Sequence, residues 1–146
     1  MDSPQTDERS LHTQRVLPFD AAAIYGAFAD GATLASWWGP AGFSNAFEVF
    51  EFREGGAWVF DMIGPDGQRY ANRSVFQRLV AGECVVIRHD CAPWFTLTVA
   101  LTPAPQGTRL DWTQTFDDPK FMQAMRGVLV PANEQNLDRL TAALHG

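Results

Sequence analysis

The sequence is poor in cysteine, in basic residues and in long apolar runs, and each shortage excludes a class of protein. Cys84 and Cys91 are the only cysteines, and the N-terminus is polar and acidic rather than an export leader, so reduced thiols are expected. Eleven Lys and Arg against 17 Asp and Glu give a formal charge of -6, which argues against a nucleic-acid partner. No apolar run approaches the roughly 18 residues of a membrane span. We expect a cytoplasmic protein without a membrane span.

Signatures of common catalytic and cofactor sites are also missing. The sequence has no Gly-rich loop between a strand and a helix, no Gly-x-Ser-x-Gly motif and no pair of carboxylates that can be placed together. His89-Asp90-Cys91 contains residue types that ligate zinc. However, neighbours on a strand point to opposite faces, and no second cluster supplies further ligands. We therefore expect neither a metal nor a cofactor.

Aromatic residues are abundant instead. Five Trp and eleven Phe occur among 146 residues, and they are densest in the segment Trp37-Trp38-Gly39-Pro40-Ala41-Gly42-Phe43. Adjacent tryptophans cannot share one face of a helix or a strand. At least one of the two is therefore expected at a boundary between the core and another environment.

The length suits one domain with a single core. Residues 1–10 are polar and charged, which predicts a disordered tail, so we expect a single domain over residues 11–146. A first strand is predicted over residues 11–19. Neither of its faces is cleanly apolar, which favours the edge of a sheet.

The hydrophobic pattern after this strand predicts two short helices and then a run of strands. Asp20 is a good N-cap for a helix over residues 21–29, which Gly31 is expected to end, and a second helix follows at about residues 33–36. Turn residues then separate strand candidates at 44–53, 57–63, 69–80, 84–89, 94–101 and 108–115. Successive strands with short connections predict an antiparallel meander.

A long helix is predicted at the end of the chain. It starts at Asp118-Pro119 and carries one apolar stripe that includes Met125 and Leu129. Pro131 lacks an amide hydrogen, and its ring clashes with the Gly127 carbonyl, so we predict a kink or break between these two residues. A strongly curved sheet wrapped around this helix would bury both apolar faces, which gives an α+β protein.

Four segments carry a resemblance to a known family: RVLPFDAAAIYGAFADGATLASWWGPAGF, FREGGAW, GPDGQRYANRSVF and NLDRLTAAL. They closely resemble the bacterial proteins named after the C-terminal domain of the activator of heat-shock-protein-ninety ATPase, in the START-like, polyketide-cyclase-like (SRPBCC) superfamily. The resemblance implies the helix-grip fold, in which a curved seven-stranded antiparallel sheet wraps a long C-terminal helix. Two short helices lie between its first two strands, and a cavity lies between sheet and helix.

Two consequences follow from the resemblance. Family members often carry Gly-Trp where this chain has Ala132-Asn133, so a polar amide replaces an indole on the inward side of the helix. In the helix-grip arrangement the double tryptophan closes the two-helix segment over the open end of the sheet. We expect Trp38 to face the cavity and Trp37 to pack behind the helices, with the segment acting as a lid hinge.

The residues expected to line a ligand cavity share an inward position in this fold. The aromatic ones are equally well explained as plain core, and Tyr70, Asn72 and Phe76 as cross-strand pairs. The candidates are Trp38, Phe43, Trp58, Phe60, Met62, Tyr70, Asn72, Phe76, Arg88, Trp94, Trp112, Met125, Leu129 and Asn133.

Three functions are compatible with the sequence. The first is binding of a small hydrophobic or amphipathic molecule between sheet and terminal helix, with polar contacts from Asn72, Arg88 or Asn133. The second is interaction with a chaperone, which the family name suggests. The third is cyclase- or hydratase-like chemistry in the same cavity, for which His89 and Asp61 are the candidate acid or base. The sequence leaves open whether the protein forms a homodimer.

Overall fold

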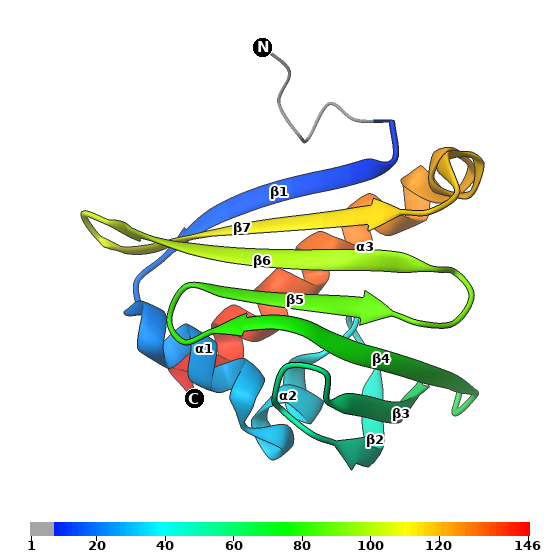
Figure 1. Cartoon of the computed structure of the whole chain (residues 1–146), viewed down its shortest axis with the longest axis horizontal. Helices are drawn as coiled ribbons and strands as arrows, with labels where there is room; N and C mark the ends of the chain where they lie inside the picture. Colours follow the sequence, from blue (N-terminus) through cyan, green and yellow to red (C-terminus); the bar gives the residue numbers. More distant parts are fainter. Residues whose placement is uncertain (1–7) are drawn as a thin grey trace.

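Seven antiparallel strands form one curved sheet, and the last helix lies across one of its faces (Figure 1). The computed structural model describes residues 8–146. The strands are β1 (Ser10–Leu17), β2 (Ser44–Phe50), β3 (Ala57–Ile63), β4 (Arg69–Val80), β5 (Cys84–His89), β6 (Phe95–Ala104) and β7 (Gly107–Phe116), in the sheet order β1-β7-β6-β5-β4-β3-β2. The helices are α1 (Ala21–Ala29), α2 (Gly31–Trp37) and α3 (Pro119–His145). The predicted helix-grip fold is confirmed.

Most boundaries agree with those predicted. The bounds of α1, β3, β4 and β5 are as expected. β2 ends at Phe50 instead of Arg53, because the chain turns back directly after it. β6 and β7 are longer than expected, because Ala104 still pairs with Gly107 at the turn between them.

β1 lies at one edge of the sheet, as its mixed faces predict, and its neighbour there is β7, the last strand of the chain. It pairs with β7 from Ser10↔Thr115 to Leu17↔Thr108, and the hydroxyl groups of Ser10 and Thr115 are 2.9 Å apart. The strand thus begins one residue before its predicted start. Residues 1–7 of the expected tail lie outside the described part of the chain.

Aspartates cap both short helices. Asp20 Oδ1 accepts a hydrogen bond from the Ala23 amide at 2.8 Å, which confirms the predicted N-cap. Asp30 separates α1 from α2, since its own amide bonds the Gly26 carbonyl while its carboxylate accepts from the Thr33 amide at 3.1 Å. The expectation that Gly31 ends the first helix is wrong, because the Asp30 cap allows Gly31 to begin α2.

α3 is continuous from Pro119 to His145, with Pro131 inside it. The sequence predicts a kink or a break, and the continuous helix excludes the break. The helix does change direction: in Figure 1 its first turns are seen nearly end-on and the rest runs obliquely behind the sheet. A helix bends where a proline removes one backbone hydrogen bond. Over residues 8–146, none of the helices combines the length and apolarity that crossing a bilayer requires.

One half of the inner sheet face is packed solid with aromatic rings. Trp58 is stacked between Phe60, at 4.3 Å between ring centroids, and Phe76, at 5.7 Å. Phe47 meets the Trp58 indole edge-on at 5.5 Å. Trp58 and Phe76 have no solvent exposure, and truncating such a residue costs about 3–5 kcal/mol. This block fixes β2, β3 and β4 to one another.

The strand register places smaller and polar residues in the other half of the inner face. Ser74 pairs with His89 on β5, and Leu97 of β6 pairs with Gln114 of β7. These positions follow the large apolar residues of the same strands at a spacing of two, so they point to the same face. Space is therefore left between this half of the sheet and α3.

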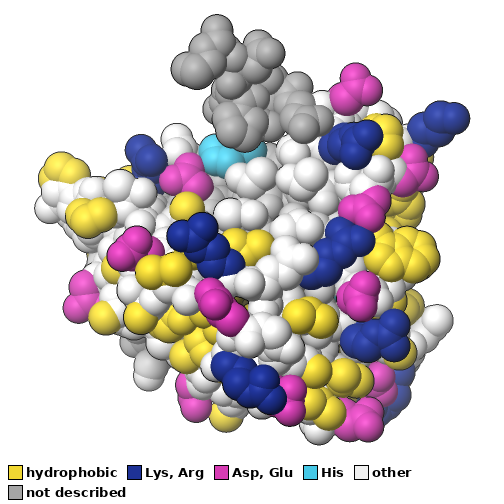
Figure 2. All heavy atoms as spheres, viewed as in Figure 1, with side chains coloured by type: hydrophobic (Ala, Val, Ile, Leu, Met, Phe, Trp, Pro, Cys, Tyr) yellow, Lys and Arg dark blue, Asp and Glu magenta, His cyan; other side chains and the backbone are white. Residues whose placement is uncertain are grey.

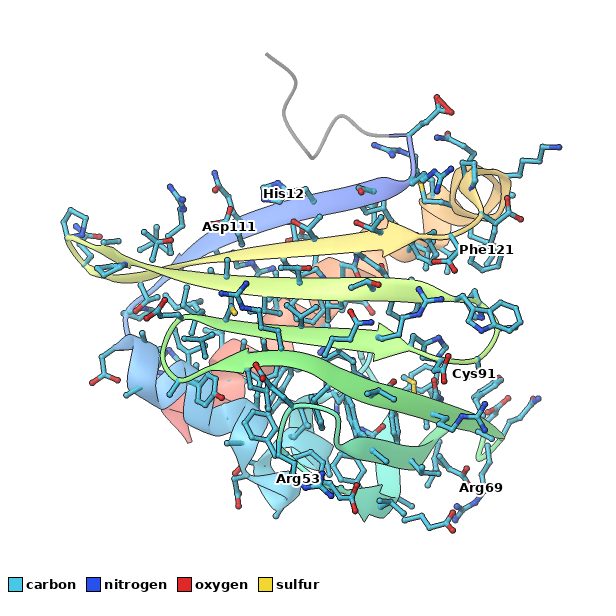
Figure 3. All side chains as sticks on the ribbon, in the orientation of Figure 1. His12, Arg53, Arg69, Cys91, Asp111 and Phe121 are labelled. Atoms are coloured by element: carbon cyan, nitrogen blue, oxygen red, sulfur yellow. The ribbon has the colours of Figure 1, made fainter. Side chains whose placement is uncertain are left out.

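The outer face of the sheet is polar. It carries threonines such as Thr98 and Thr113, which are directly opposite each other on β6 and β7. His12 Nε2 and Asp111 Oδ1 are 3.0 Å apart on the two neighbouring strands β1 and β7 (Figure 3). Acidic and basic side chains are interspersed with small apolar areas over this face (Figure 2), which is ordinary for a solvated sheet surface.

Candidate functional site

A cavity of about 280 Å³ lies between the open half of the sheet and α3. Its walls come from the loop after α2, from β3 to β7 and from the middle of α3. Most of the lining is aromatic or aliphatic, and it includes Trp38, Phe60, Met62, Ile87, Phe95, Leu97, Trp112 and Leu129. Among the described residues, no Asp, Glu, Lys or Arg belongs to the lining. The site is thus an uncharged, largely apolar pocket.

Six polar side chains interrupt this apolar wall: Asn72, Ser74, His89, Gln114, Asn133 and Asn136. Asn133 Nδ2 on α3 donates to Gln114 Oε1 on β7 at 3.1 Å, so the pair bridges helix and sheet. This bond uses the donor of Asn133 and the acceptor of Gln114, and it leaves the opposite end of each amide for other partners. The cavity therefore offers both donors and acceptors to a guest.

His89 is the titratable group of the cavity wall. It is 6% exposed, and its ring stacks on Phe95 at 4.5 Å with an angle of 15° between planes. Burial is the main influence on its protonation and lowers the pKa of His89 from the ordinary 6.5, and the neighbouring Arg88 charge adds to the lowering. The imidazole is neutral at pH 7.

The hydrogen bonds of His89 define its tautomer. Nδ1 lies 2.7 Å from the Pro93 carbonyl oxygen, which can only accept, so Nδ1 carries the hydrogen. Nε2 then carries the lone pair, and it lies 2.7 Å from Asn72 Oδ1 and 3.5 Å from Cys91 Sγ. Asn72 Nδ2 donates to the Tyr70 carbonyl at 2.9 Å. Oδ1 only accepts, so this contact suits a protonated ring, whereas a neutral ring pairs with Asn72 when the amide turns Nδ2 toward Nε2 and gives up its bond to Tyr70. Nε2 is placed to accept a proton.

The two adjacent tryptophans have different surroundings. Trp37 ends α2, has no solvent exposure and donates from Nε1 to the Ala27 carbonyl at 3.1 Å. Trp38 caps the helix, lines the cavity and meets Trp58 at 5.1 Å between ring centroids. As expected, one indole faces the cavity while the other packs behind the helices.

Arg139 holds the loop after Trp38 in place. Its guanidinium on α3 donates hydrogen bonds of 2.8 to 3.0 Å to the carbonyl oxygens of Ser36, Trp38, Gly39, Pro40 and Phe43. Burial lowers the pKa of Arg139 below its ordinary value, yet the group stays charged at any ordinary pH. The segment that was expected to act as a lid hinge is therefore a fixed part of the cavity wall, because its carbonyl groups are hydrogen-bonded to α3.

Two neighbouring amides extend this clamp. Asn136 Nδ2 donates to the Trp37 carbonyl at 3.0 Å. Asn45 Nδ2 on β2 donates to the carbonyl oxygens of Ala35 and Trp38 at 3.0 and 2.9 Å. The end of α2 is thus fixed from the helix side and from the sheet side.

A model of one protein family matches residues 18–145 of this chain, nearly its whole length. Its description is Activator of Hsp90 ATPase homolog 1-like protein. The chain belongs to this family.

Solved structures of related folds support the assignment. A protein from Nitrosomonas europaea has a TM-score of 0.85 at 18% identity, covering 94% of this chain and 95% of that chain. One from Chromobacterium violaceum has a TM-score of 0.81 at 26% identity, covering 91% and 95%. A solution structure from Arthrobacter aurescens has a TM-score of 0.86 at 22% identity, covering 99% and 90%. No protein with a curated description matches the sequence.

The structure brings half of the predicted ligand residues together in this cavity. The lining contains Trp38, Phe60, Met62, Asn72, Trp112, Leu129 and Asn133. Asn133 reaches it from the apolar stripe of α3.

Two predicted residues belong to the solid aromatic block instead. Trp58 and Phe76 point to the inner face as expected, but they lie toward α1 and α2, where rings fill the space. Alternation along a strand predicts the face of a residue and not its position along the cavity.

Five other predicted residues lie outside the lining for different reasons. Arg88 points outward and binds Asp117 through two hydrogen bonds of 2.8 and 2.7 Å. Trp94 precedes β6 and is 49% exposed. Tyr70 is also exposed. Phe43 is half-buried beside it, with 6.2 Å between the two ring centroids. Met125 is half-buried on the first turns of α3.

Asp61 lies on the outer face of β3, as the alternation predicts. Its carboxylate pairs with Arg69 at 3.2 Å. It has no access to the cavity and is excluded as an internal acid or base. In the described part of the chain, no group of three His, Cys, Asp or Glu side chains is arranged to hold a metal ion.

Several residues of the site were not predicted from the sequence. Gln114 continues the inward series of Leu110 and Trp112 at a spacing of two, which was a usable signal. Asn136 lies beside Leu137 on the buried side of α3, where a polar residue is unusual. Arg139 carried no such signal, because an arginine on a helix is usually solvated.

Proposed function

We propose that the protein binds a small, uncharged, largely apolar molecule in the cavity between the sheet and α3. The observation that carries this proposal is the composition of the wall: aromatic and aliphatic side chains, a few amides, and no charged residue among those described. Ligand sites in proteins are typically apolar, with a few polar groups that set orientation.

The electrostatics of the cavity favour a neutral ligand. Transferring an isolated charge from water into an apolar site costs several kcal/mol unless a partner of opposite charge is present. The nearest cation to the wall, Arg139, already has five carbonyl acceptors. A carboxylate or ammonium inside the cavity would therefore lack a counter-charge.

The size of the cavity favours a ligand of one or two rings. Its volume of about 280 Å³ lies just below the range of about 300–1,000 Å³ that small-molecule sites occupy. Indoles from Trp38 and Trp112 give flat surfaces on which an aromatic ring can stack. The amides of Asn72, Gln114 and Asn133 can orient one hydroxyl or carbonyl group.

Titration with 1-naphthol tests the proposal, because this neutral two-ring molecule carries a single hydroxyl. Binding should quench tryptophan emission through Trp38 and Trp112. It should also raise the unfolding temperature, because free ligand at 100 times Kd stabilises the folded state by about 2.7 kcal/mol. The anion 1-naphthoate has a similar shape and should bind at least about tenfold more weakly, which is about 1.4 kcal/mol.

A variant that fills the cavity provides the control. Ala132→Phe adds a ring at the wall of α3 and should abolish binding, whereas Ala124→Phe adds the same ring at an exposed position of the helix and should not. Equal affinity for naphthol and naphthoate, or unchanged binding by Ala132→Phe, would refute the proposal.

His89 favours acid–base chemistry as a second candidate function. Its Nε2 can accept a proton, it belongs to the cavity lining, and the Pro93 carbonyl fixes its tautomer. Such a group could exchange a proton with a carbonyl compound bound in the cavity. Exchange of solvent deuterium into the α-position of 2-tetralone, faster with the protein than with His89→Gln, would support this function; equal rates would dismiss it.

A further inference from the structure

A second pocket of about 350 Å³ lies on the other side of the loop between β5 and β6. It is an open groove lined by Ala92, Pro93 and Trp94 of that loop, by Phe116 at the end of β7, and by Phe121 on the first turn of α3, with Asp117 and Asp118 between them. Of these, Pro93 alone also borders the central cavity. Phe121 is at the edge of the molecule where α3 begins (Figure 3).

Aromatic surface makes up the walls of this groove. Trp94 is 49% exposed, whereas Trp37, Trp58 and Trp112 are at most 2% exposed. The rings of Phe116 and Phe121 lie 5.7 Å apart at an angle of 43°, and Phe95 supports Phe116 from behind at 5.3 Å. The exposed part of the Trp94 indole buries no surface in the core, so core packing does not explain why it lies beside this fixed pair of rings.

The groove also carries negative charge. Asp117 is paired with Arg88 through two hydrogen bonds. Asp118 uses Oδ1 to cap α3, accepting from the Lys120 amide at 2.9 Å, and no described residue forms an ion pair with it. Among the described residues, Asp118 therefore has no ion-pair partner, and it shares the groove with the exposed Trp94, the half-buried Phe121 and the buried Phe116.

We propose that this groove binds a small organic cation whose nitrogen carries alkyl groups, such as a quaternary ammonium head group. The faces of indole and phenyl rings attract cations, and alkylated ammonium groups are the ligands that clusters of aromatic rings recognise. Asp118 supplies the opposite charge. The formal charge of -6 on the whole chain adds a favourable field for a cation.

The lining distinguishes this ligand class from its competitors. Inorganic cations need several oxygen ligands, and the described residues give the groove two carboxylates, of which Asp117 is already paired. A neutral apolar molecule would use the rings but gain nothing from Asp118. A bare ammonium is strongly hydrated, whereas methyl groups on the nitrogen allow the charge to approach the rings with little loss of hydration.

Choline and its uncharged isostere 3,3-dimethylbutan-1-ol test the proposal, since they share a shape and differ in charge. The indole N–H signals of the protein are followed by NMR during each titration. Choline should shift the Trp94 signal, which is identified by its absence in Trp94→Leu, and should bind about threefold or more tighter than the isostere, the range expected for an exposed cation–π contact. The signal of Trp112 in the central cavity should not move.

Two variants separate the contributions. Asp118→Asn keeps a good N-cap and removes the charge, so it should reduce the preference for choline to near unity. Trp94→Leu keeps an apolar side chain at an exposed position and should weaken choline binding several-fold.

Three results would overturn the proposal: equal binding of choline and its isostere, an unchanged preference in Asp118→Asn, or a shift confined to Trp112. The last would place choline in the central cavity. The test is independent of the function proposed for that cavity, because it uses a different probe and a different tryptophan.

Discussion

Arg139 contributes to stability through a set of hydrogen bonds that lysine cannot reproduce. Its planar guanidinium reaches five carbonyl oxygens of residues 36–43, whereas an ammonium has three donors on a single atom. We expect Arg139→Lys to lower the free energy of unfolding by about 2–3 kcal/mol, measured by urea denaturation. Arg126→Lys, at an exposed position of the same helix, should change it by less than about 0.5 kcal/mol. Equal effects of the two variants would contradict the clamp.

His89 makes stability depend on pH. Its pKa in the folded protein is below the ordinary 6.5, so below pH 6.5 the unfolded chain binds more protons and unfolding is favoured. The contribution of His89 to stability is therefore complete above about pH 6.5 and is lost as the pH falls through the folded pKa.

Thermal unfolding between pH 7.5 and 5 measures this effect. His89→Gln should show a smaller fall in stability over this range than the parent protein. His145→Gln, which changes an exposed residue, should keep the full dependence. The same slope for parent and His89→Gln would show that other groups are responsible.

At the scale of residues, the sequence predicts positions that depend on local rules. The Asp20 cap follows from local chain chemistry, and the separation of Trp37 from Trp38 follows from chain geometry, whereas the expectation that Trp38 faces the cavity came from the family resemblance. The role of Arg139 follows from none of these, because its acceptors are backbone carbonyls some 100 positions away, and carbonyls are present at every residue.

At the scale of elements, the hairpin between β2 and β3 depends on one of its two glycines much more than on the other. A Cβ at Gly56 would lie 2.0 Å from the Glu51 carbonyl oxygen, so Gly56→Ala must displace the turn and should cost more than about 3 kcal/mol. Gly55 has a φ of +81° and open space around its Cα, so Gly55→Ala should cost about 1–2 kcal/mol for its backbone conformation. Denaturation of both variants measures the difference, and similar losses would contradict it.

Element boundaries could be predicted where the sequence contains a sharp signal. β3 and β4 lie between glycine-containing turns, β5 lies between a glycine-containing turn and the loop with Pro93, and the bounds of all three agree with the expectation. The interior of α3 is different, because Pro131 predicts a disturbance but not its extent. Packing of both halves of the helix, through Met122 and through Leu137 and Leu140, keeps it continuous.

At the scale of the whole molecule, the excess of acid sets the solution behaviour. The calculated pI is about 4.9, and proteins associate most readily where their net charge is near zero. We expect light scattering to be greatest near pH 5 and low at pH 7.5, where repulsion between molecules of charge -6 opposes contact. A scattering maximum above pH 7 would contradict this, and circular dichroism at each pH separates association from unfolding.

The fold as a whole could be predicted, but the extent of the cavity could not. The order of elements and the inward faces follow from hydrophobic patterns, and the family resemblance gives their arrangement. The point at which the inner face changes from solid packing to open space depends on the register between strands, because this register places Ser74 and His89 side by side. Register depends on paired strands and on the turn between them, so it cannot be predicted from the sequence of one strand alone.

The pairing of β1 with β7 has a consequence for how the protein folds during synthesis. Ser10 and Thr115 are 105 positions apart, so at ribosomal rates of about 5–20 residues per second the first strand waits for roughly 5–20 s before its partner exists. The β2 to β7 meander can form from neighbouring strands, whereas the pairing of β1 with β7 joins the two most distant strands of the sheet and is expected last among the strand pairings. A nascent chain released early would therefore expose β1 as an unpaired strand, the form in which sheet proteins aggregate.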